Sequence, residues 1–362
     1  MKIAAIETIH ISIPFIHHGP STGFAATNFD NLATLIVKVE TDAGITGYGE
    51  AFGYNAIPAT RAAIEQIIKP HLIGRDATAI SALMAEIQQT LHIFGRYGPV
   101  LYGISGIDIA LWDIAGKAAG LPLYRLFGGA SRTELPVYAS LLRYGDPEVV
   151  RDRTADAVSQ GYRYVKLHER TVPSIRAARE AAGDDVGIMV DVNCPWTVQQ
   201  SIRMARAFEP YDIFWLEEPV WPPENFEGLA EVTAATPVPI AAGENYCTAW
   251  QFKALLDAGA VTYAQPSVTK VGGITEFRKV ATLAETANVL LAPHSPYFGP
   301  GFLATLHLAA NSTEPVERFF GNLEATLFGD MVNPTNALLS LPQGPGLGCD
   351  PDPDVIREYL VE

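Results

Sequence analysis

From residue 135 onward, short β-forming runs alternate with helical segments, and no other feature of the sequence constrains the fold as much. Eight such runs recur at a spacing of about 26 residues, and amphipathic or Ala-rich segments separate them. This spacing is typical of βα units, and eight units favour a closed parallel barrel over an open sheet. The expected strands cover residues 135–141, 162–168, 186–193, 212–219, 238–245, 261–268, 288–294 and 316–322.

The first third of the chain has another pattern and predicts a small α+β unit. Its β-forming runs alternate apolar and polar residues, and TDAG at 41–44 predicts a hairpin turn. Helical periodicity then extends from Ala59 to Leu126, and Gly120 with Pro122 ends the last helix. The expected strands of this unit cover residues 9–13, 32–40 and 45–52.

These patterns divide the chain into three parts. We expect an α+β capping domain over residues 1–130, followed by a (β/α) barrel over residues 131–325 that would carry the catalytic groups. The remaining segment, 326–362, is rich in proline and glycine. We expect this C-terminal segment to return to the capping domain and pack on it.

The composition argues against several classes of function. A formal net charge of −15 makes a nucleic-acid or anionic-membrane partner improbable. No apolar run is long enough to cross a bilayer, and the N-terminal residues lack the pattern of a signal peptide. The cysteines are too few and too scattered for a disulfide framework; they are Cys194, Cys247 and Cys349. We therefore expect a cytoplasmic protein that acts on a small molecule, without nucleic acid or membrane.

Acidic residues end three consecutive strands of the expected barrel. Asp191 ends the third strand, Glu217 the fourth and Glu244 the fifth, and strand ends of this kind share the rim where barrel active sites lie. Convergent carboxylates repel one another unless a cation lies among them, and oxygen ligands favour Mg²⁺, with Mn²⁺ as an alternative. Because side chains alternate along a strand, only one of Glu217 and Glu218 can face the ion.

At this point the sequence resembles a known family. The segments SGIDIALWDIAGKAAGLPLYRLFGG (105–129) and VDVNCPW…FWLEEP (190–219) resemble the two signatures of the mandelate racemase/muconate lactonizing enzymes of the enolase superfamily. The resemblance spans essentially the whole chain. It implies an α+β cap on a modified TIM barrel of the (β/α)7β type, with Asp191, Glu217 and Glu244 as Mg²⁺ ligands. It also implies an ion that holds a substrate carboxylate and stabilises the enediolate formed when the α-proton leaves. We expect a homo-oligomer, between a dimer and an octamer.

The second expected strand carries a candidate base. Lys166 and His168 lie two residues apart in YVKLHE, so both side chains should point into the barrel. The resemblance implies that Lys166 contacts the substrate carboxylate. The family usually has a basic lysine at the position of His168, and a histidine can replace it because imidazole titrates near neutrality.

The seventh expected strand ends in a second histidine, His294, which matches the acid/base histidine of the family. An aspartate ending the sixth strand normally orients that histidine, but this chain has Ser267 there. We expect Ser267 to hold the imidazole by a hydrogen bond, which stabilises an imidazolium less than a carboxylate does. Lys270 could replace the aspartate, although we expect a lysine in this loop to face solvent.

The remaining candidates lie around the same rim. Glu317 matches an acid that hydrogen-bonds the substrate carboxylate, which would require a protonated carboxyl group. A salt bridge to Arg318 or to another basic group is the structural alternative for Glu317. We expect Asn193 to orient a substrate hydroxyl or a metal ligand. The other substrate-binding candidates are Ser267, Lys270, Trp196 and Tyr297, and the loops expected to close over the site are 15–29 and 52–58.

Three functions remain open from the sequence. The first is a Mg²⁺-dependent dehydratase that eliminates water from a hydroxy acid or sugar acid, with His168 and His294 as the proton-transfer groups. The second is a racemase or epimerase that uses the same two histidines on opposite faces of the α-carbon. The third is a barrel that binds a ligand without turnover. The aromatic residues near the rim favour a compact, partly apolar acid as the substrate.

Overall fold

The computed structural model describes residues 1–19 and 29–361. Its N-terminal part is an α+β cap whose first three strands form an antiparallel sheet in the order β1-β2-β3. These strands are β1 (Ile3–Ile16), β2 (Asn31–Thr41) and β3 (Thr46–Ala51). The helical elements of the cap are η1 (Tyr54–Ala56), α1 (Ile57–Ala62), η2 (Ala63–Ile68), η3 (Lys69–His71), α2 (Ile80–Thr90), η4 (His92–Phe94), α3 (Pro99–Ala119) and α4 (Leu123–Leu126).

Helix α3 packs closely on β3, and a glycine makes the contact feasible. A Cβ atom added to Gly49 would lie 1.9 Å from the carbonyl oxygen of Gly106 on α3. The helix ends at Gly120, which adopts a left-handed conformation with φ of 66°, as the sequence predicts. The predicted hairpin turn is also present, since Thr41 N donates to Ile45 O across it. The cap sheet and α3 therefore form one packed unit.

The second part of the chain contains all eight expected barrel strands, each within or close to its expected range. The strands are β4 (Glu134–Ser140), β5 (Tyr164–Leu167), β6 (Gly187–Asp191), β7 (Ile213–Glu217), β8 (Ile240–Ala242), β9 (Tyr263–Ala264), β10 (Leu290–Leu291) and β11 (Val316–Phe319). Between them lie the helices α5 (Pro147–Ser159), α6 (Val172–Ala182), α7 (Val198–Phe208), α8 (Phe226–Ala235), α9 (Thr248–Asp257), α10 (Gly273–Thr286) and α11 (Pro300–Leu308), with the short turn η5 (Glu209–Tyr211) after α7.

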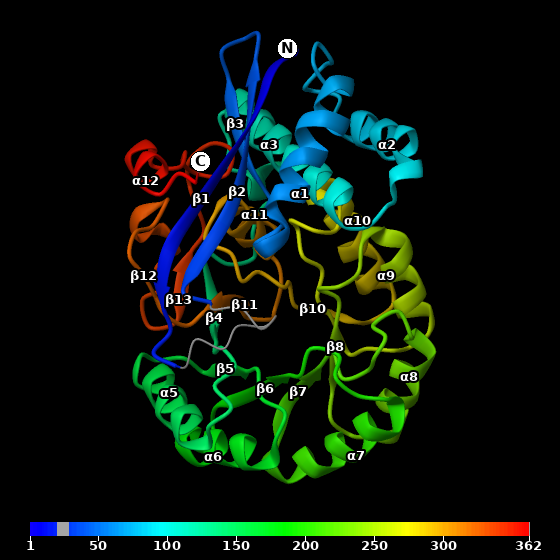
Figure 1. Cartoon of the computed structure of the whole chain (residues 1–362), viewed down its shortest axis with the longest axis vertical. Coiled ribbons are helices and arrows are strands. Elements are labelled where there is room, and N and C mark those ends of the chain that lie inside the picture. Colours follow the sequence, from blue (N-terminus) through cyan, green and yellow to red (C-terminus); the bar gives the residue numbers. More distant parts are fainter. Residues whose placement is uncertain (20–28, 362) are drawn as a thin grey trace.

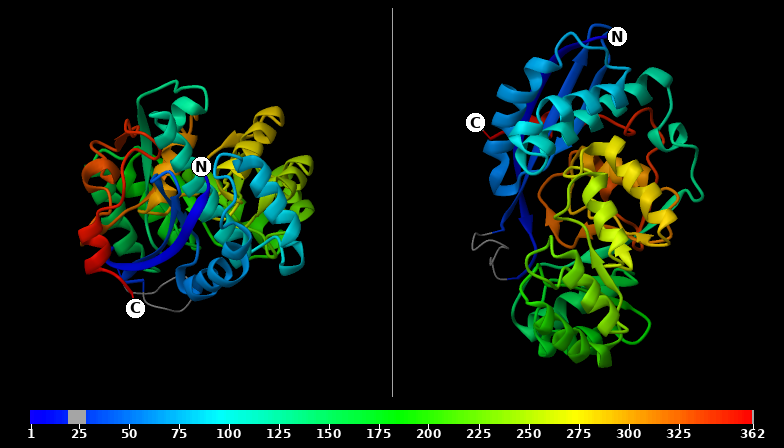
Figure 2. Two further views of the ribbon diagram at one scale, coloured as in Figure 1. Left: turned by 90° about the horizontal axis from the view of Figure 1, so that it is seen from above. Right: turned by 90° about the vertical axis from the view of Figure 1, so that its right-hand side faces the viewer.

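The barrel is a modified (β/α) barrel, as expected. Its strands are parallel neighbours in the order β10-β9-β8-β7-β6-β5-β4-β11, so that β10 and β11 are the two ends of the hydrogen-bonded path. The helices lie on the outside of the strands, and the cap lies over one end of the molecule (Figures 1 and 2). No helix among the described residues is long and apolar enough to cross a membrane.

The C-terminal segment contacts both the cap and the barrel. Strand β12 (Asn322–Leu323), which precedes this segment, pairs with β1, and the chain end returns to the same strand, where Val361 N donates to His10 O. Helix α12 (Pro353–Glu358) accordingly lies beside β1 (Figure 1). Strand β13 (Leu338–Ser340), after the turn η6 (Gly329–Val332), instead pairs with β4 of the barrel. The segment expected to pack on the cap therefore also pairs with a strand of the barrel.

Candidate metal and acid–base site

The carboxylates of the site stand directly above the packed floor of the barrel. Met189 on β6 and Trp215 on β7 are fully buried in an apolar layer inside the barrel. Side chains repeat every two residues on one face of a strand, so Asp191 and Glu217 point into the barrel above this layer. Asp191 and Glu217 are also register partners across the two strands. Local strand geometry thus brings two acids side by side.

The third acid completes the group from the next strand. Asp191, Glu217 and Glu244 each offer one carboxylate oxygen, and these oxygens lie within 4.8 Å of one another. Glu244 follows Gly243, where the chain passes so close to Gln265 that an added Cβ atom would lie 2.6 Å from the Gln265 backbone. Three converging carboxylates are a donor set suited to a hard divalent ion such as Mg²⁺ or Mn²⁺. The residues present therefore fit such an ion.

The backbone separates Glu218 from its neighbour Glu217. Glu218 has a φ of 48°, and its carboxylate accepts two hydrogen bonds from Asn245 Nδ2, at 2.8 and 3.0 Å. Cys194 Sγ donates to the same carboxylate at 3.5 Å. Glu217 instead accepts a hydrogen bond from Trp215 Nε1 at 2.9 Å within the barrel. The two adjacent acids thus have different surroundings, and only Glu217 belongs to the converging group.

Lys166 lies among the acids and is fully buried. Its Nζ is 3.1 Å from Glu217 Oε1, 2.7 Å from Glu317 Oε1 and 3.6 Å from Asp191 Oδ2. Burial disfavours the charge, yet attraction to Glu217 and Glu317 outweighs burial and holds the pKa of Lys166 well above its ordinary value. Lys166 is therefore a fixed ammonium beside the carboxylate group.

His168 shares this side of the barrel with Lys166, two residues earlier on β5. Its Nε2 lies 3.2 Å from Asp191 Oδ2, while Nδ1 is hydrogen-bonded to the carbonyl oxygen of Leu141. The carbonyl oxygen and the carboxylate oxygen both only accept, so each ring nitrogen faces an acceptor. The structure therefore holds His168 between Leu141 and the carboxylate group, with Nε2 on the side of Asp191.

His294 reaches the acids from the opposite side. Its Nε2 lies 2.7 Å from Glu244 Oε2 and 3.9 Å from Glu317 Oε2. The expected direct hydrogen bond from Ser267 to this ring is wrong. Ser267 Oγ bonds the hydroxyl of Tyr297, and that hydroxyl lies 3.4 Å from His294 Nδ1. The phenol of Tyr297 thus separates the serine from the imidazole.

Glu317 differs from the expectation of a protonated carboxyl group. Burial raises its pKa, but the attraction of Lys166 and His294 is stronger, and the net effect lowers the pKa. Ser140 Oγ donates to Glu317 Oε1 at 2.8 Å, and Ser295 N donates to Oε2 at 3.0 Å. All of these partners favour the ionised form, so Glu317 is an anionic partner of Lys166.

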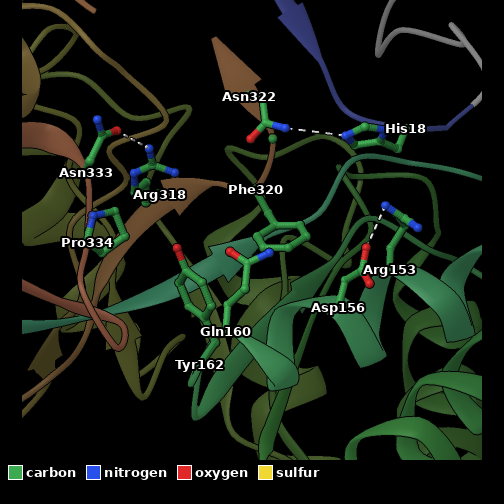
Figure 3. A pocket seen from close by; sticks show the side chains of 11 residues that line it. His18, Arg153, Asp156, Gln160, Tyr162, Arg318, Phe320, Asn322, Asn333 and Pro334 are labelled. Atoms are coloured by element: carbon green, nitrogen blue, oxygen red, sulfur yellow. Dashed lines mark hydrogen bonds and ion pairs between the residues drawn. The ribbon is translucent and has the colours of Figure 1, made fainter. Parts of the chain in front are cut away.

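The neighbouring Arg318 points away from this site. It lines a separate cavity of about 240 Å³ together with residues of α5, and its Nη2 donates to Asn333 Oδ1 (Figure 3). Two further guanidinium bonds go to the carbonyl oxygens of Val332 and Phe319. Adjacent side chains on β11 therefore face opposite sides of the strand, which rules out the salt bridge between Glu317 and Arg318 that the sequence left open.

A cavity of about 360 Å³ opens above the carboxylates, and the cap closes over it. Residues of both parts line the cavity: Phe52, Tyr54 and Tyr102 from the cap, and Arg143, His168, Arg170, Asn193, Glu244, Asn245, Lys270, His294, Pro296, Glu317 and Phe319 from the barrel. Lys270 is only 4% exposed, with its Nζ 4.5 Å from the centre of the Phe52 ring, so the expectation that it faces solvent is wrong. The lining thus combines three cations with aromatic side chains from the cap and from β11.

Sequence reasoning missed two arginines of this lining. Arg143 donates through Nη2 to Asn193 Oδ1 at 2.6 Å and through Nε to the carbonyl oxygen of His168. Arg170 donates through Nε to the carbonyl oxygen of Val192 at 2.8 Å. Both follow the ends of barrel strands, so the rule that identified the acids would also have identified the arginines.

Other predicted substrate-binding residues do not line the cavity. Trp196 packs on Phe208 of α7, with ring centroids 6.3 Å apart. Ser267 and Tyr297 are buried behind His294. The middle of the expected loop 15–29 (residues 20–28) lies outside the described residues. At the end of that loop, Phe29 packs edge-on against Phe319 of the cavity lining, at 5.7 Å between centroids.

Comparisons with known proteins agree with this geometry. Residues 6–128 match the family described as mandelate racemase/muconate lactonizing enzyme, N-terminal domain, and residues 149–355 match the family described as enolase C-terminal domain-like. Arabinonate dehydratase from Saccharolobus solfataricus is 33% identical over 337 residues, which cover 90% of each chain. D-galactarolactone cycloisomerase from Agrobacterium fabrum is 32% identical over 385 residues, covering 100% of this chain and 99% of its own.

A solved structure extends the likeness to the whole fold. A racemase from Streptomyces coelicolor A3(2), solved with bound magnesium, superposes with a TM-score of 0.88 at 31% identity. The superposition covers 99% of this chain and 100% of the racemase. The similarity therefore includes the cap as well as the barrel.

Proposed function

This chain belongs to the mandelate racemase/muconate lactonizing enzyme family of the enolase superfamily, and from that premise we propose that it is a Mg²⁺-dependent dehydratase of sugar acids. One observation carries the proposal. His168 follows β5 and His294 follows β10, and the strands that supply the three carboxylates lie between them in the sheet order. Two imidazoles thus flank one candidate metal group, as removal of a proton and departure of a hydroxyl require.

Asp191, Glu217 and Glu244 would hold the ion. A bound Mg²⁺ supplies positive charge that stabilises negative charge developing on the substrate carboxyl group. Lys166 adds a second positive charge next to this group, because its ammonium lies 3.1 Å from Glu217 Oε1. Lys166 is therefore suited to bind the substrate carboxylate, and the imidazoles remain for proton transfer.

His168 takes the α-proton in this proposal. Its Nδ1 donates to the carbonyl oxygen of Leu141, so Nε2, which lies 3.2 Å from Asp191 Oδ2, is the nitrogen that would take the proton from carbon. His294 then gives a proton to the β-hydroxyl on the other side. The C–H and C–O bonds break, water leaves, and the enol product rearranges to a 2-keto-3-deoxy acid.

The polar lining of the cavity favours a polyhydroxylated substrate. Arg143, Arg170 and Lys270 offer donors, and Asn193 and Asn245 offer amides. Hydroxyl groups along a sugar acid can accept and donate hydrogen bonds with these groups, which an apolar chain cannot. The arginines follow β4 and β5, on the side of His168, so we place the distal hydroxyl groups there.

Proton NMR in D₂O with a panel of aldonates and aldarates tests this function. We expect a 2-keto-3-deoxy product with Mg²⁺ and no product after removal of Mg²⁺ by a chelator. Exchange of the α-proton with an unchanged carbon skeleton would instead identify a racemase or epimerase, which the two flanking imidazoles also suit. Absence of both reactions across the panel would leave a barrel that binds without turnover, and the proposal would be wrong.

A further inference from the structure

We propose that the cavity of about 240 Å³ beside Arg318 is a second binding site, which takes a small oxyanion in the form of a phosphate or carboxylate group. Among the described residues, the lining of this cavity has no member in common with the lining of the cavity above the carboxylates. Glu317 and Arg318 are neighbours on β11, and their side chains face opposite sides of the strand. The second site is therefore separate from the proposed reaction.

Arg318 is a buried cation whose hydrogen-bond partners are neutral. Its side chain is 8% exposed, and its guanidinium donates to the carbonyl oxygens of Val332 and Phe319 and to the amide oxygen of Asn333. Figure 3 shows the guanidinium between Asn333 and the hydroxyl of Tyr162. In the described part of the chain, no carboxylate forms an ion pair with Arg318. These partners therefore satisfy N–H groups without supplying negative charge.

An uncompensated buried charge favours the binding of an anion. Burial lowers the pKa of Arg318, and the neighbouring Tyr162 offsets only part of that effect. A guanidinium nevertheless stays charged in proteins, so the folded chain carries the free-energy cost of burying this charge. An oxyanion in the adjacent cavity would reduce that cost by placing a negative charge beside the guanidinium.

The cavity as a whole has an excess of positive charge, in a chain whose net charge is −15. Two guanidiniums, of Arg153 and Arg318, and one carboxylate, of Asp156, are in its described lining. Asp156 already pairs with Arg153, with Oδ2 2.7 Å from Nη1. Figure 3 shows this ion pair on the other side of Phe320 from Arg318. The acid of the lining is therefore engaged elsewhere and does not neutralise Arg318.

The remaining polar groups of the lining include donors for an oxyanion. Asn333 accepts from Arg318 through Oδ1, so the other end of its side chain is an N–H donor, and Gln160 carries a further amide. Guanidinium and amide N–H groups together are suited to the oxygens of a phosphate or a carboxylate. A water molecule needs only about 15 Å³ of such volume, so the cavity has room for an oxyanion together with its waters.

Asn333→Asp tests the proposal with little change in side-chain shape. The new carboxylate would lie where Asn333 Oδ1 now lies, 3.1 Å from Arg318 Nη2, and would supply the negative charge itself. We expect inorganic phosphate to bind the natural chain loaded with Mg²⁺, and Asn333→Asp to weaken this binding by about tenfold or more. Titration calorimetry measures both affinities. Equal affinities would overturn the proposal.

Asn288→Asp is the matched control. It makes the same change of charge at another exposed position, and Asn288 does not line the cavity. We expect this variant to keep the phosphate affinity within about twofold of the natural value, because screening by solvent and salt weakens the repulsion between exposed, distant charges. A loss as large as that in Asn333→Asp would show a general effect of the net charge and count against the site.

Urea unfolding gives a second readout that does not depend on phosphate binding to the variant. Without phosphate, Asn333→Asp should unfold at a higher urea concentration than the natural chain, because Arg318 gains a counter-charge. Added phosphate should raise the midpoint of the natural chain and leave that of Asn333→Asp nearly unchanged. A midpoint in Asn333→Asp equal to or below the natural one would show that Arg318 is already compensated, and the proposal would be wrong.

Two further comparisons identify the bound group and exclude the metal site. Acetate in place of phosphate tests for a carboxylate: binding of either probe that is lost in Asn333→Asp supports the site and names its group, and binding of neither overturns it. Phosphate held by Mg²⁺ at Asp191, Glu217 and Glu244 would be released by a chelator, whereas phosphate beside Arg318 should remain. Loss of all phosphate binding with the chelator would therefore assign the anion to the metal site and overturn the proposal.

Discussion

The ammonium of Lys166 lies 2.7 Å from the carboxylate of Glu317, and both side chains are buried. The same ammonium contacts Glu217 at 3.1 Å, so one cation connects the acid of β11 to the candidate metal ligands. Removing one partner of a buried ion network leaves uncompensated charge, which costs more than the loss of an exposed ion pair. The stability of the site therefore depends on this lysine.

Lys166→Met should destabilise the protein most when Mg²⁺ is absent. Without either cation, the buried carboxylates of Asp191, Glu217 and Glu317 repel one another, and we expect a loss of about 3 kcal/mol in the free energy of unfolding. Added Mg²⁺ should recover part of the loss. Urea unfolding without Mg²⁺ measures the loss of stability, and urea unfolding with Mg²⁺ measures the recovery. Lys253→Met, which removes an exposed pair with Asp257, is the control and should cost less than about 1 kcal/mol. Equal losses in the two variants would contradict the prediction.

Adjacent acids provide a matched test of the metal site. Glu217→Gln should weaken Mg²⁺ binding strongly, because Glu217 is one of the three converging carboxylates. Glu218→Gln should leave the affinity within about threefold, since Glu218 is bonded to Asn245 instead. Titration calorimetry with Mg²⁺ measures both affinities, and circular dichroism checks that each variant is folded. Unchanged Mg²⁺ affinity in Glu217→Gln would show that the ligand assignment is wrong.

Strand-end residues were predictable from the sequence because strand periodicity alone fixes their direction. Asp191 and Glu217 end neighbouring strands and point inward for that reason, while Arg143 and Arg170 lie in the loops that follow β4 and β5 at the same rim. The eight barrel strands follow from the alternation of strand and helix patterns. These features depend on local sequence.

The features that sequence reasoning missed depend on contacts between distant segments. Lys270 is buried because Phe52 of the cap covers it, and the loop pattern contains no sign of that contact. The ionised state of Glu317 depends on Lys166 from another strand. Tyr297 lies between Ser267 and His294 only because two loops pack together. Residues that are far apart in the sequence leave no repeating pattern from which their hydrogen bond could be predicted.

His168→Gln should abolish exchange of the α-proton and keep the metal. Glutamine can retain a hydrogen bond with Leu141 O but cannot accept a proton at neutral pH, so we expect a loss of roughly a hundredfold or more in rate. Exchange is followed by proton NMR in D₂O, with Mg²⁺ affinity from calorimetry as the control. Full exchange in this variant would make His168 a bystander and shift the role of base to His294.

A buried carboxyl group where the cap meets the barrel should make stability depend on pH. Glu50, on β3 of the cap, is 5% exposed, and its polar contact is with Gly301 N, at 2.9 Å on α11. Burial raises the pKa of Glu50 from 4.5 to about 8. Between these pH values the folded state holds one more proton at this group than the unfolded state, so stability falls as pH rises through that window. Above pH 8 the contribution of Glu50 to the free energy of unfolding no longer changes with pH.

Glu50→Gln removes this titration while keeping the shape of the side chain. We compare the free energy of unfolding of the variant with that of the natural protein. The difference, variant minus natural, should be constant below pH 4.5 and increase up to pH 8. The steepest slope should approach about 1.4 kcal/mol per pH unit. Urea unfolding at pH 4.5, 6, 7 and 8.5 measures the difference. Glu227→Gln, at an exposed position on α8, is the control and should show no such trend. Parallel stability curves for Glu50→Gln and the natural protein would mean that Glu50 stays ionised in the fold, and burial at this contact would then carry no penalty for the charge.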